Sequence, residues 1–208
     1  MAPVAAHGVT LAPLRQCGHV TRPEIWLCRH GETEWSLDGR HTSRTDLPLT
    51  PVGMKQARRL ATRLAGVAFD LVLTSPRRRA ADTAALAGFP DAIVEPAAEE
   101  WDYGEGEGRT TESIREEIPG WTVWTHPLPG AETPEQVGAR ADKVIEHVQA
   151  EAPHRAVLFS HAHFLRIMAA RWIELPATEG VRLLLEVASV SVLGWEREVR
   201  AVKRWNVE

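Results

Sequence analysis

A short apolar run that ends abruptly at residue 29 constrains the fold more than any other feature of the sequence. Ile25 to Cys28 are apolar without interruption, which is typical of a strand buried on both faces. Arg29, His30 and Gly31 follow at once, and glycine lets the backbone turn sharply. In open α/β sheets, ligands bind outside the carboxyl ends of the strands. The pattern therefore predicts that a strand carries Arg29 and His30 to a ligand site, although His30 alone would read equally well as an ordinary loop histidine.

Further apolar runs alternate with amphipathic segments along the rest of the chain. Strands are predicted at 69–74, 93–94 and 156–160, and helices at 50–66, 77–86, 111–118, 133–148 and 163–173. The apolar runs at 183–195 and 199–205 are predicted to form an antiparallel hairpin at the sheet edge. Alternation of strands and helices requires parallel strands with right-handed crossovers. We therefore predict an α/β fold, a three-layer αβα sandwich whose mostly parallel central sheet has an antiparallel edge strand.

Length and the distribution of prolines and glycines favour a single folded domain. The chain has 208 residues, of which 44% are hydrophobic, and this is enough to bury one sizeable core. Prolines and glycines interrupt every apolar run between residues 1 and 24. We expect a flexible leader at 1–24 and one domain at 25–208, with neither a secretion signal nor a membrane span in the leader.

Charge and cysteine content narrow the partners and the compartment. The net charge is −4 and the pI is near 6.2, and no block of Lys or Arg occurs. These values argue against nucleic acid or an anionic membrane as a partner. Cys17 and Cys28 are too few for a disulfide framework, so reduced thiols in the cytoplasm are expected. The sequence leaves open whether the chain forms a homodimer.

Five separated motifs resemble one protein family. They are Arg29-His30-Gly31-Glu32-Thr33, Thr45-Asp46-Leu47-Pro48-Leu49-Thr50, Ser75-Pro76-Arg77-Arg78-Arg79-Ala80, Glu100-Trp101-Asp102-Tyr103-Gly104 and Phe159-Ser160-His161. In this order they resemble the histidine phosphatase superfamily, the phosphoglycerate mutase-like enzymes that pass a phosphoryl group through a phosphohistidine. Their wording is most similar to small phosphatases that include sedoheptulose bisphosphatase-like and mycobacterial acid phosphatase-like members. The resemblance implies a phosphoglycerate mutase-like fold.

The resemblance also implies roles for individual residues. His30 would be the nucleophile that attacks phosphorus, and Glu100 would be the general acid. Arg29 and Arg79 would hold the phosphoryl oxygens, because a planar guanidinium matches two oxygens at once. His161 would lie beside the phosphate, at a strand end and near a helix N-terminus.

No metal or other cofactor is expected. His161 and His163 are spaced two apart, which could suggest metal ligands, but no Asp or Glu accompanies them in the sequence. The chemistry that the resemblance implies needs no metal.

A second group of residues is predicted to contact the substrate. Its members are Ser36, Thr42, Ser43, Tyr103, Trp124 and Ala162, with His41 and the 129–133 loop beside them. Trp124 and the other tryptophans could instead be packing residues. Ser36 replaces an Asn that many relatives have, and Ser43 and Ala162 replace glycines. A larger residue is common where this chain has Gly106. These departures affect the expected substrate contacts more than the expected chemistry.

Together these implications favour a phosphomonoesterase that acts on a small phosphorylated metabolite, such as a sugar phosphate. A mutase that recycles a bisphosphorylated intermediate is the alternative enzyme. A phosphate-binding module without activity is disfavoured, since all five implied catalytic residues are present.

Overall fold

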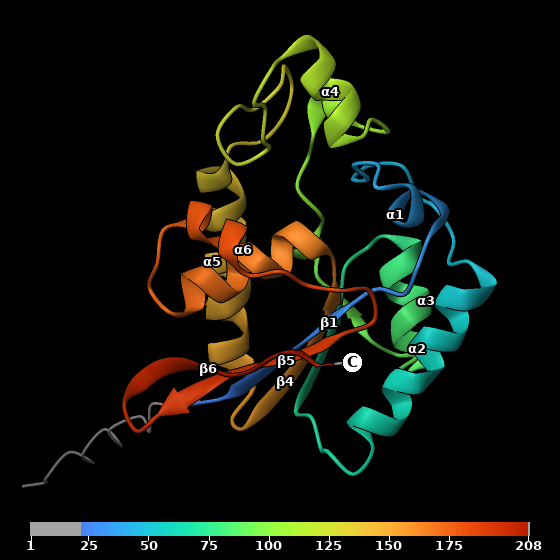
Figure 1. Ribbon diagram of the computed structural model, residues 1–208. Coiled ribbons are helices and arrows are strands. Elements are labelled where there is room, and N and C mark those ends of the chain that lie inside the picture. Colours follow the sequence, from blue (N-terminus) through green and yellow to red (C-terminus); the bar gives the residue numbers. More distant parts are fainter. Residues whose placement is uncertain (1–21, 208) are drawn as a thin grey trace, which may run out of the picture.

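The computed structural model describes residues 22–207 and has a six-stranded mixed sheet between two layers of helices (Figure 1). The strands are β1 (Glu24–Arg29), β2 (Leu71–Thr74), β3 (Ile93–Val94), β4 (Arg155–Ser160), β5 (Val190–Glu196) and β6 (Val199–Val207). They lie in the order β3-β2-β4-β1-β5-β6. The first four are parallel, whereas β5 and β6 run antiparallel at one edge. The predicted α/β fold with a mostly parallel sheet is confirmed.

Helices cover both faces of this sheet. The α-helices are α1 (Glu34–Asp38), α2 (Pro51–Leu64), α3 (Arg78–Leu86), α4 (Thr111–Glu117), α5 (Pro134–Glu151) and α6 (Ala162–Trp172). Short 3-10 helices are η1 (Pro96–Ala98), η2 (Gly104–Gly106) and η3 (Ala177–Arg182). Helices α2 and α3 cover one face and α5 and α6 the other, while α4 projects beyond the carboxyl ends of the parallel strands (Figure 1).

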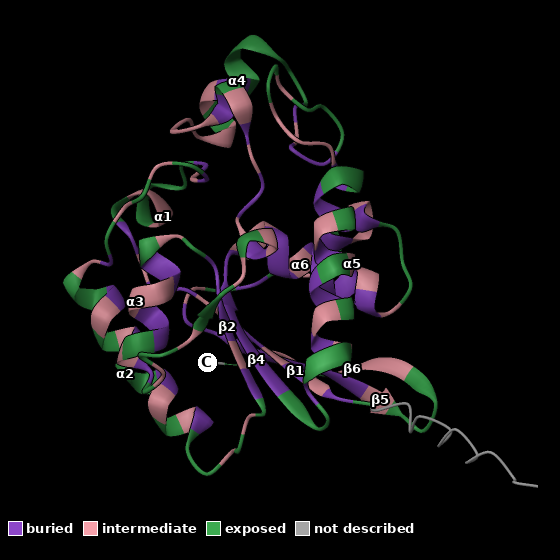
Figure 2. Cartoon of the chain, turned by 180° about the vertical axis from the view of Figure 1, so that it is seen from behind, coloured by how far each residue is buried: buried purple, intermediate pink, exposed green. Residues whose placement is uncertain are grey.

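Two apolar cores lie on opposite faces of the sheet. Along β1, Leu27 packs in the core beneath α5 and α6, whereas Cys28 packs in the core beneath α2 and α3. Leu158 and Phe159 of β4 divide between the same two cores. Successive side chains of a strand point to opposite faces, so these strands are apolar at every position because both faces are covered. Figure 2 shows the central strands buried accordingly.

Two of the helices begin with a threonine followed by proline. The Thr50 side chain accepts a hydrogen bond from the amide of Gly53, and that of Thr133 accepts one from the amide of Gln136. Gln136 completes a capping box on Thr133. Each cap satisfies an amide that the helix leaves unpaired, which is typically worth about 1 kcal/mol. The caps fix where α2 and α5 start, close to the carboxyl end of the sheet.

The pairing of β1 with β4 decides which residues meet at that end. The two strands are parallel neighbours, with Arg29 opposite Ser160. The amide of His30 donates a hydrogen bond to the carbonyl of Ser160 at 3.0 Å. The next residue of each strand is a histidine, so the sheet itself places His30 beside His161.

The structure differs from the sequence prediction in three places. The predicted strand from residue 183 is wrong, because β5 starts only at Val190 and η3 precedes it. The 3-10 helix η1, which precedes Glu100, was not predicted. The short helix α1 was not predicted either. The antiparallel edge consists of two strands, as the predicted hairpin requires.

The described chain begins close to the hairpin that joins β5 to β6. Arg22 donates a hydrogen bond to the carbonyl of Arg197 at 3.0 Å, and Trp195 Nε1 donates to the carbonyl of Pro23 at 3.2 Å. Since β1 starts at Glu24, the predicted boundary after residue 24 falls inside a strand. Residues 1–21 of the leader predicted at 1–24, including Cys17, lie outside the described residues. Within 22–207, none of the helices has the length and apolarity needed to cross a membrane.

Candidate active site

His30 lies at the end of β1 in a fixed orientation. Its Nδ1 is 2.7 Å from the carbonyl oxygen of Gly31, and a carbonyl can only accept. In the neutral ring, Nδ1 therefore carries the proton and Nε2 keeps its lone pair. Burial, followed by the charges of Arg79 and Arg29, holds the pKa of His30 well below its usual value. The ring is neutral at neutral pH, which is the state that a nucleophile requires.

Gly31 is required by a close approach of two backbones. A Cβ at Gly31 would lie 2.5 Å from the carbonyl oxygen of Gly53, in the first turn of α2. A Cβ at Gly53 would in turn lie 2.1 Å from the carbonyl oxygen of Glu32. The amide of Gly31 donates to Thr83 Oγ1 at 3.1 Å. Helices α2 and α3 thus hold the turn that follows the histidine.

His161 lies beside His30, with the two ring centroids 5.3 Å apart. Its Nδ1 accepts a hydrogen bond from Arg79 Nε at 3.1 Å, so the proton of the neutral ring is on Nε2. Nε2 lies 2.7 Å from Ser75 Oγ and donates to it. Burial and the neighbouring Arg79 charge hold the pKa of His161 well below its usual value. Both nitrogens are used, so in this arrangement His161 acts on the site through Arg79.

Arg79 is fully buried, and its guanidinium is directed at a loop as well as at His161. It donates to the carbonyl of Thr45 at 3.1 Å, of Thr42 at 3.1 Å and of Ser43 at 3.3 Å. The carboxylate of Glu107 holds the same loop, because it accepts from the amides of Ser43 and Thr45 at 2.9 Å each. Glu107, which the sequence analysis did not identify, therefore fixes the loop on which Arg79 rests.

Arg29 combines a positive charge with an unused donor. One terminal nitrogen donates to the carbonyl of Leu185. Its Nε is buried and finds no hydrogen-bond partner among residues 22–207. The side chain of Arg29 also lines the cavity beside His30, so its guanidinium can donate to an acceptor there, such as a phosphoryl oxygen. Burial lowers the pKa of Arg29, and the Glu100 carboxylate opposes that shift.

Glu100 is held at the N-terminus of α6. One carboxylate oxygen accepts from the amides of Trp101 at 2.9 Å and Phe164 at 2.8 Å, and the other accepts from the amide of His163 at 3.1 Å. His161 begins α6 without a side-chain cap, and Glu100 supplies these acceptors in its place. The carboxylate is thereby fixed in the cavity beside Arg29 and His30.

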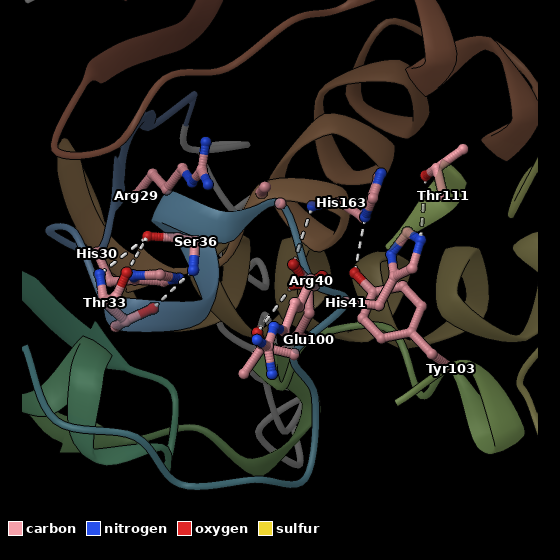
Figure 3. A pocket seen from close by; sticks show the side chains of 13 residues that line it. Arg29, His30, Thr33, Ser36, Arg40, His41, Glu100, Tyr103, Thr111 and His163 are labelled. Atoms are coloured by element: carbon pink, nitrogen blue, oxygen red, sulfur yellow. Dashed lines mark hydrogen bonds between the residues drawn. The ribbon is translucent and has the colours of Figure 1, made fainter. Parts of the chain in front are cut away.

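A cavity of about 250 Å³ joins these groups (Figure 3). Its lining residues are Arg29, His30, Thr33, Ser36, Gly39, Arg40, His41, Thr42, Glu100, Tyr103, Thr111, Ala162 and His163. Three of the five implied catalytic residues are among them, while Arg79 and His161 are not. The fold therefore brings all five together. Arg29, His30 and Glu100 line the cavity, while Arg79 and His161 lie behind its surface and support it.

The predicted substrate residues separate in the structure. Ser36, Thr42, Tyr103 and Ala162 line the cavity, whereas Ser43 and Trp124 do not. Ser43 is buried in the loop that holds Arg79. Trp124 is also buried, and its ring lies 5.3 Å from the rings of Trp101 and His163, centroid to centroid. In this arrangement Trp124 packs against neighbouring rings and does not line the cavity.

One wall of the cavity consists of rings. Tyr103 O–H lies 2.7 Å from His163 Nδ1, and the ring centroids of His41 and Tyr103 are 4.7 Å apart (Figure 3). Burial lowers the pKa of His163 well below its usual value and that of His41 to about 4, so both are neutral at neutral pH. The sequence analysis considered His163 only as a metal ligand. Its position two residues after a strand-end histidine, on the first turn of a helix, was the signal for a wall residue.

Within the described chain, no group of three or more His, Cys, Asp or Glu side chains is arranged to hold a metal ion. The charged side chains that line the cavity are instead those of Arg29, Arg40 and Glu100, beside the neutral imidazole of His30. This set can bind a phosphoryl group, attack it from His30 Nε2 and exchange a proton with its ester oxygen.

Several known proteins are similar to this chain in sequence. The sequence profile of the histidine phosphatase superfamily (branch 1) matches residues 25–208. An acid phosphatase from Mycobacterium tuberculosis is 44% identical over 184 residues, covering 87% of this chain and 91% of that protein. A sedoheptulose 1,7-bisphosphatase from Saccharomyces cerevisiae is 32% identical over 201 residues, covering 81% and 74% respectively.

A solved structure supports the same relationship. The product of an open reading frame from Mycobacterium tuberculosis has a TM-score of 0.84 to this chain at 40% identity, covering 89% of this chain and 97% of that one. The chain belongs to branch 1 of the histidine phosphatase superfamily.

Proposed function

We propose that the chain is a phosphomonoesterase that hydrolyses small phosphorylated metabolites, sugar phosphates among them, through a phosphohistidine at His30. The observation that carries this proposal is the 2.7 Å contact between His30 Nδ1 and the carbonyl oxygen of Gly31. Because a carbonyl only accepts, Nδ1 donates and the neutral ring keeps its lone pair on Nε2. Similarity to an acid phosphatase and to a sedoheptulose 1,7-bisphosphatase favours hydrolysis of a phosphate ester.

In the first step, His30 Nε2 attacks phosphorus and the bond between phosphorus and the ester oxygen breaks. The guanidinium of Arg29, which lines the cavity, donates to a phosphoryl oxygen. Glu100 in its acid form gives a proton to the departing oxygen, so that an alcohol leaves rather than an alkoxide. The products of this step are the free alcohol, the phosphohistidine and the Glu100 carboxylate.

In the second step, the Glu100 carboxylate takes a proton from water and the oxygen of that water attacks phosphorus. The bond between phosphorus and His30 Nε2 breaks, and inorganic phosphate leaves. The imidazole recovers its lone pair and Glu100 recovers its proton, so both groups are ready for another substrate. Through both steps the Gly31 carbonyl keeps the ring of His30 in one orientation.

The cavity dimensions favour a small substrate. A volume of about 250 Å³ accommodates a phosphoryl group and a short polar group attached to it. The ring wall of His41, Tyr103 and His163 offers flat surfaces, and Arg40 lines the same cavity with a positive charge. A sugar phosphate has both the hydroxyl groups and the apolar ring faces that such a surface can contact.

Rapid-quench labelling tests this proposal. The wild-type chain is mixed with ³²P-labelled phenyl phosphate, quenched, and examined for label that is lost in acid and kept in base, as a phosphohistidine requires. Release of inorganic phosphate is measured in parallel on a panel of phosphorylated metabolites ranked by kcat/KM. Labelled protein with phosphate release supports the proposal. Isomerised phosphate esters without phosphate release would favour the mutase alternative, and absence of both would refute an enzymatic role.

A further inference from the structure

Arg140 of α5 uses all five of its N–H donors, two on Glu132 and three on the segment that carries Glu100. Two of them bind Glu132, with Nε 2.8 Å from Oε1 and a terminal nitrogen 2.7 Å from Oε2. The others donate to main-chain carbonyls, those of Ala97 at 2.7 Å, Glu99 at 2.9 Å and Glu100 at 3.3 Å. A guanidinium with every donor engaged is a fixed group, because moving it breaks several hydrogen bonds at once.

The segment from 97 to 102 depends on such side chains for its hydrogen bonds. It begins in η1 and continues outside the sheet, where the carbonyl of Asp102 accepts from the amide of Glu132 at 2.9 Å. Ser160 Oγ donates to the carbonyl of Ala98 at 2.7 Å, and Arg140 serves Ala97, Glu99 and Glu100. Buried carbonyls need a donor, so these side chains hold the main chain in place.

Glu132 extends the same support toward the other end of the segment. Its Oε2 accepts from the amide of Asp102 at 3.0 Å, and its own carbonyl accepts from Trp101 Nε1 at 2.8 Å. The main chain on both sides of Glu100 is thereby tied to the Arg140–Glu132 pair. The side chain of Glu100 is held separately, by the amides at the start of α6.

We propose that Arg140, paired with Glu132, is a positioning residue that sets where the Glu100 carboxylate stands relative to the leaving oxygen. The inference rests on the proposed function, in which Glu100 transfers the proton. Neither Arg140 nor Glu132 is among the residues that line the cavity. The inference requires that their effect on catalysis pass through Glu100 and that it be largest for substrates that need an acid.

The test compares Arg140→Lys with a matched control, Arg171→Lys. Arg171 also binds a carboxylate with two nitrogens, at 3.0 Å to each oxygen of Asp142. It lies in the last turn of α6, whereas Glu100 is held at the first turn of that helix. Phenyl phosphate and p-nitrophenyl phosphate have nearly the same shape, and only phenolate needs strong protonation to leave. In Arg140→Lys, kcat/KM for phenyl phosphate should fall by about 10-fold to 10²-fold, while kcat/KM for p-nitrophenyl phosphate changes little. Arg171→Lys should change neither value, whatever it does to the melting temperature.

A double-mutant cycle with Glu100→Gln then shows whether Arg140 acts through Glu100. Once the acid is gone, Arg140→Lys should cost little more on phenyl phosphate. Full additivity, or an equal loss on both substrates, would overturn the inference. Failure of the wild-type chain to hydrolyse either substrate would instead refute the proposed function, and a Glu100→Gln variant that slows both substrates equally would remove Glu100 as the acid. If Arg140→Lys does not fold, Glu132→Gln, which keeps the side-chain shape, carries the same comparison.

Discussion

His30 and His161 stand 5.3 Å apart, centroid to centroid, because each is the residue that follows one of two paired parallel strands. Their separation is set by the hydrogen bonds of a sheet and not by a loop. The pairing also orders their roles, since His161 has both nitrogens engaged while His30 keeps Nε2 free. One histidine is available to the substrate and the other supports Arg79.

Replacement of His30 tests the nucleophile. His30→Ala removes the only atom proposed to bond to phosphorus, so activity should fall on the order of 10⁴-fold or more on every substrate, whatever its leaving group. The measurement is kcat/KM for phenyl and p-nitrophenyl phosphate, together with phosphate labelling of the protein. His154→Ala, at an exposed position, serves as the control. Labelling that persists in His30→Ala would show that another residue is the nucleophile.

Replacement of Glu100 should affect substrates unequally. Glu100→Gln cannot protonate a leaving group, so kcat/KM for alkyl and phenyl phosphates should fall about 10²-fold to 10⁴-fold. With p-nitrophenyl phosphate the first step should be nearly spared, and slow hydrolysis of the phosphohistidine should appear as a burst of nitrophenol. Glu99→Gln is the adjacent control, since Glu99 pairs with Arg77 at 3.1 Å. An equal loss on both kinds of substrate without a burst would point to a different acid.

Glu107→Ala should weaken the site in a way that does not depend on the leaving group. The amides of Ser43 and Thr45 would lose their acceptor, and the loop that holds Arg79 would loosen. We expect a loss of roughly 10-fold in kcat/KM on phenyl and p-nitrophenyl phosphate alike, from the usual cost of unpaired buried amides. Glu105→Ala, at an exposed neighbouring position, is the control. Selective loss on phenyl phosphate would contradict a role through Arg79.

Acidic pH should destabilise the fold through the histidines at the site. The pKa of His41 is lowered to about 4, and the pKa values of His30, His161 and His163 are also lowered, with burial as the largest cause. The unfolded chain binds protons near pH 6.5, so below that pH it holds protons that the folded chain excludes. Stability should be full above about pH 6.5 and fall toward pH 4, by up to about 1.4 kcal/mol per pH unit for each such histidine.

Urea denaturation between pH 7 and pH 4.5 measures this dependence. His41→Gln removes one of the four groups, and its free energy of unfolding should depend less steeply on pH than that of the wild type. An unchanged slope would mean that His41 takes up its proton in the folded chain. Activity should show no loss at the ordinary histidine pKa, because the pKa of His30 lies well below it.

Chelation should leave activity intact. The proposed phosphoryl contacts come from Arg29 and His30, and neither step of the proposed reaction passes through a metal. Hydrolysis of p-nitrophenyl phosphate should therefore be unchanged in excess EDTA, while vanadate, which mimics a phosphoryl group in transfer, should inhibit competitively. Loss of activity on chelation that a single divalent ion restores would refute the proposed site.

Sequence predicted those parts of the fold whose signals are local. The uninterrupted apolar residues at 25–28 and the caps at Thr50 and Thr133 each act within a few residues, and the structure agrees with them. The run from 183 is apolar as well, yet it is no strand. The carbonyl of Leu184 accepts from Trp205 Nε1 and that of Leu185 from Arg29, so side chains replace a strand partner there.

Long-range support was beyond the reach of sequence patterns. Glu107 binds amides 62 and 64 residues away, and nothing near it in the sequence indicates that loop. Trp124 illustrates the opposite case, since an aromatic residue near a site can face either the ligand or the core. The ring contacts of Trp124 with Trp101 and His163 join residues that are far apart in the sequence, so no local pattern indicates them.

The close contact of Gly31 with Gly53 fixes how near helix α2 lies to the turn that follows His30. Each glycine is packed against main-chain atoms at the other's turn, so no side chain nearby could shrink to make room for a methyl group on either one. Neither position can therefore accept a larger residue unless the main chain moves, and an exchange at one glycine has no simple compensation at the other. By contrast, most walls of the cavity are side chains borne on loops and on the first turns of α1, α4 and α6, which can vary one at a time. The same scaffold can in this way acquire new substrates while the reach of its histidine stays fixed.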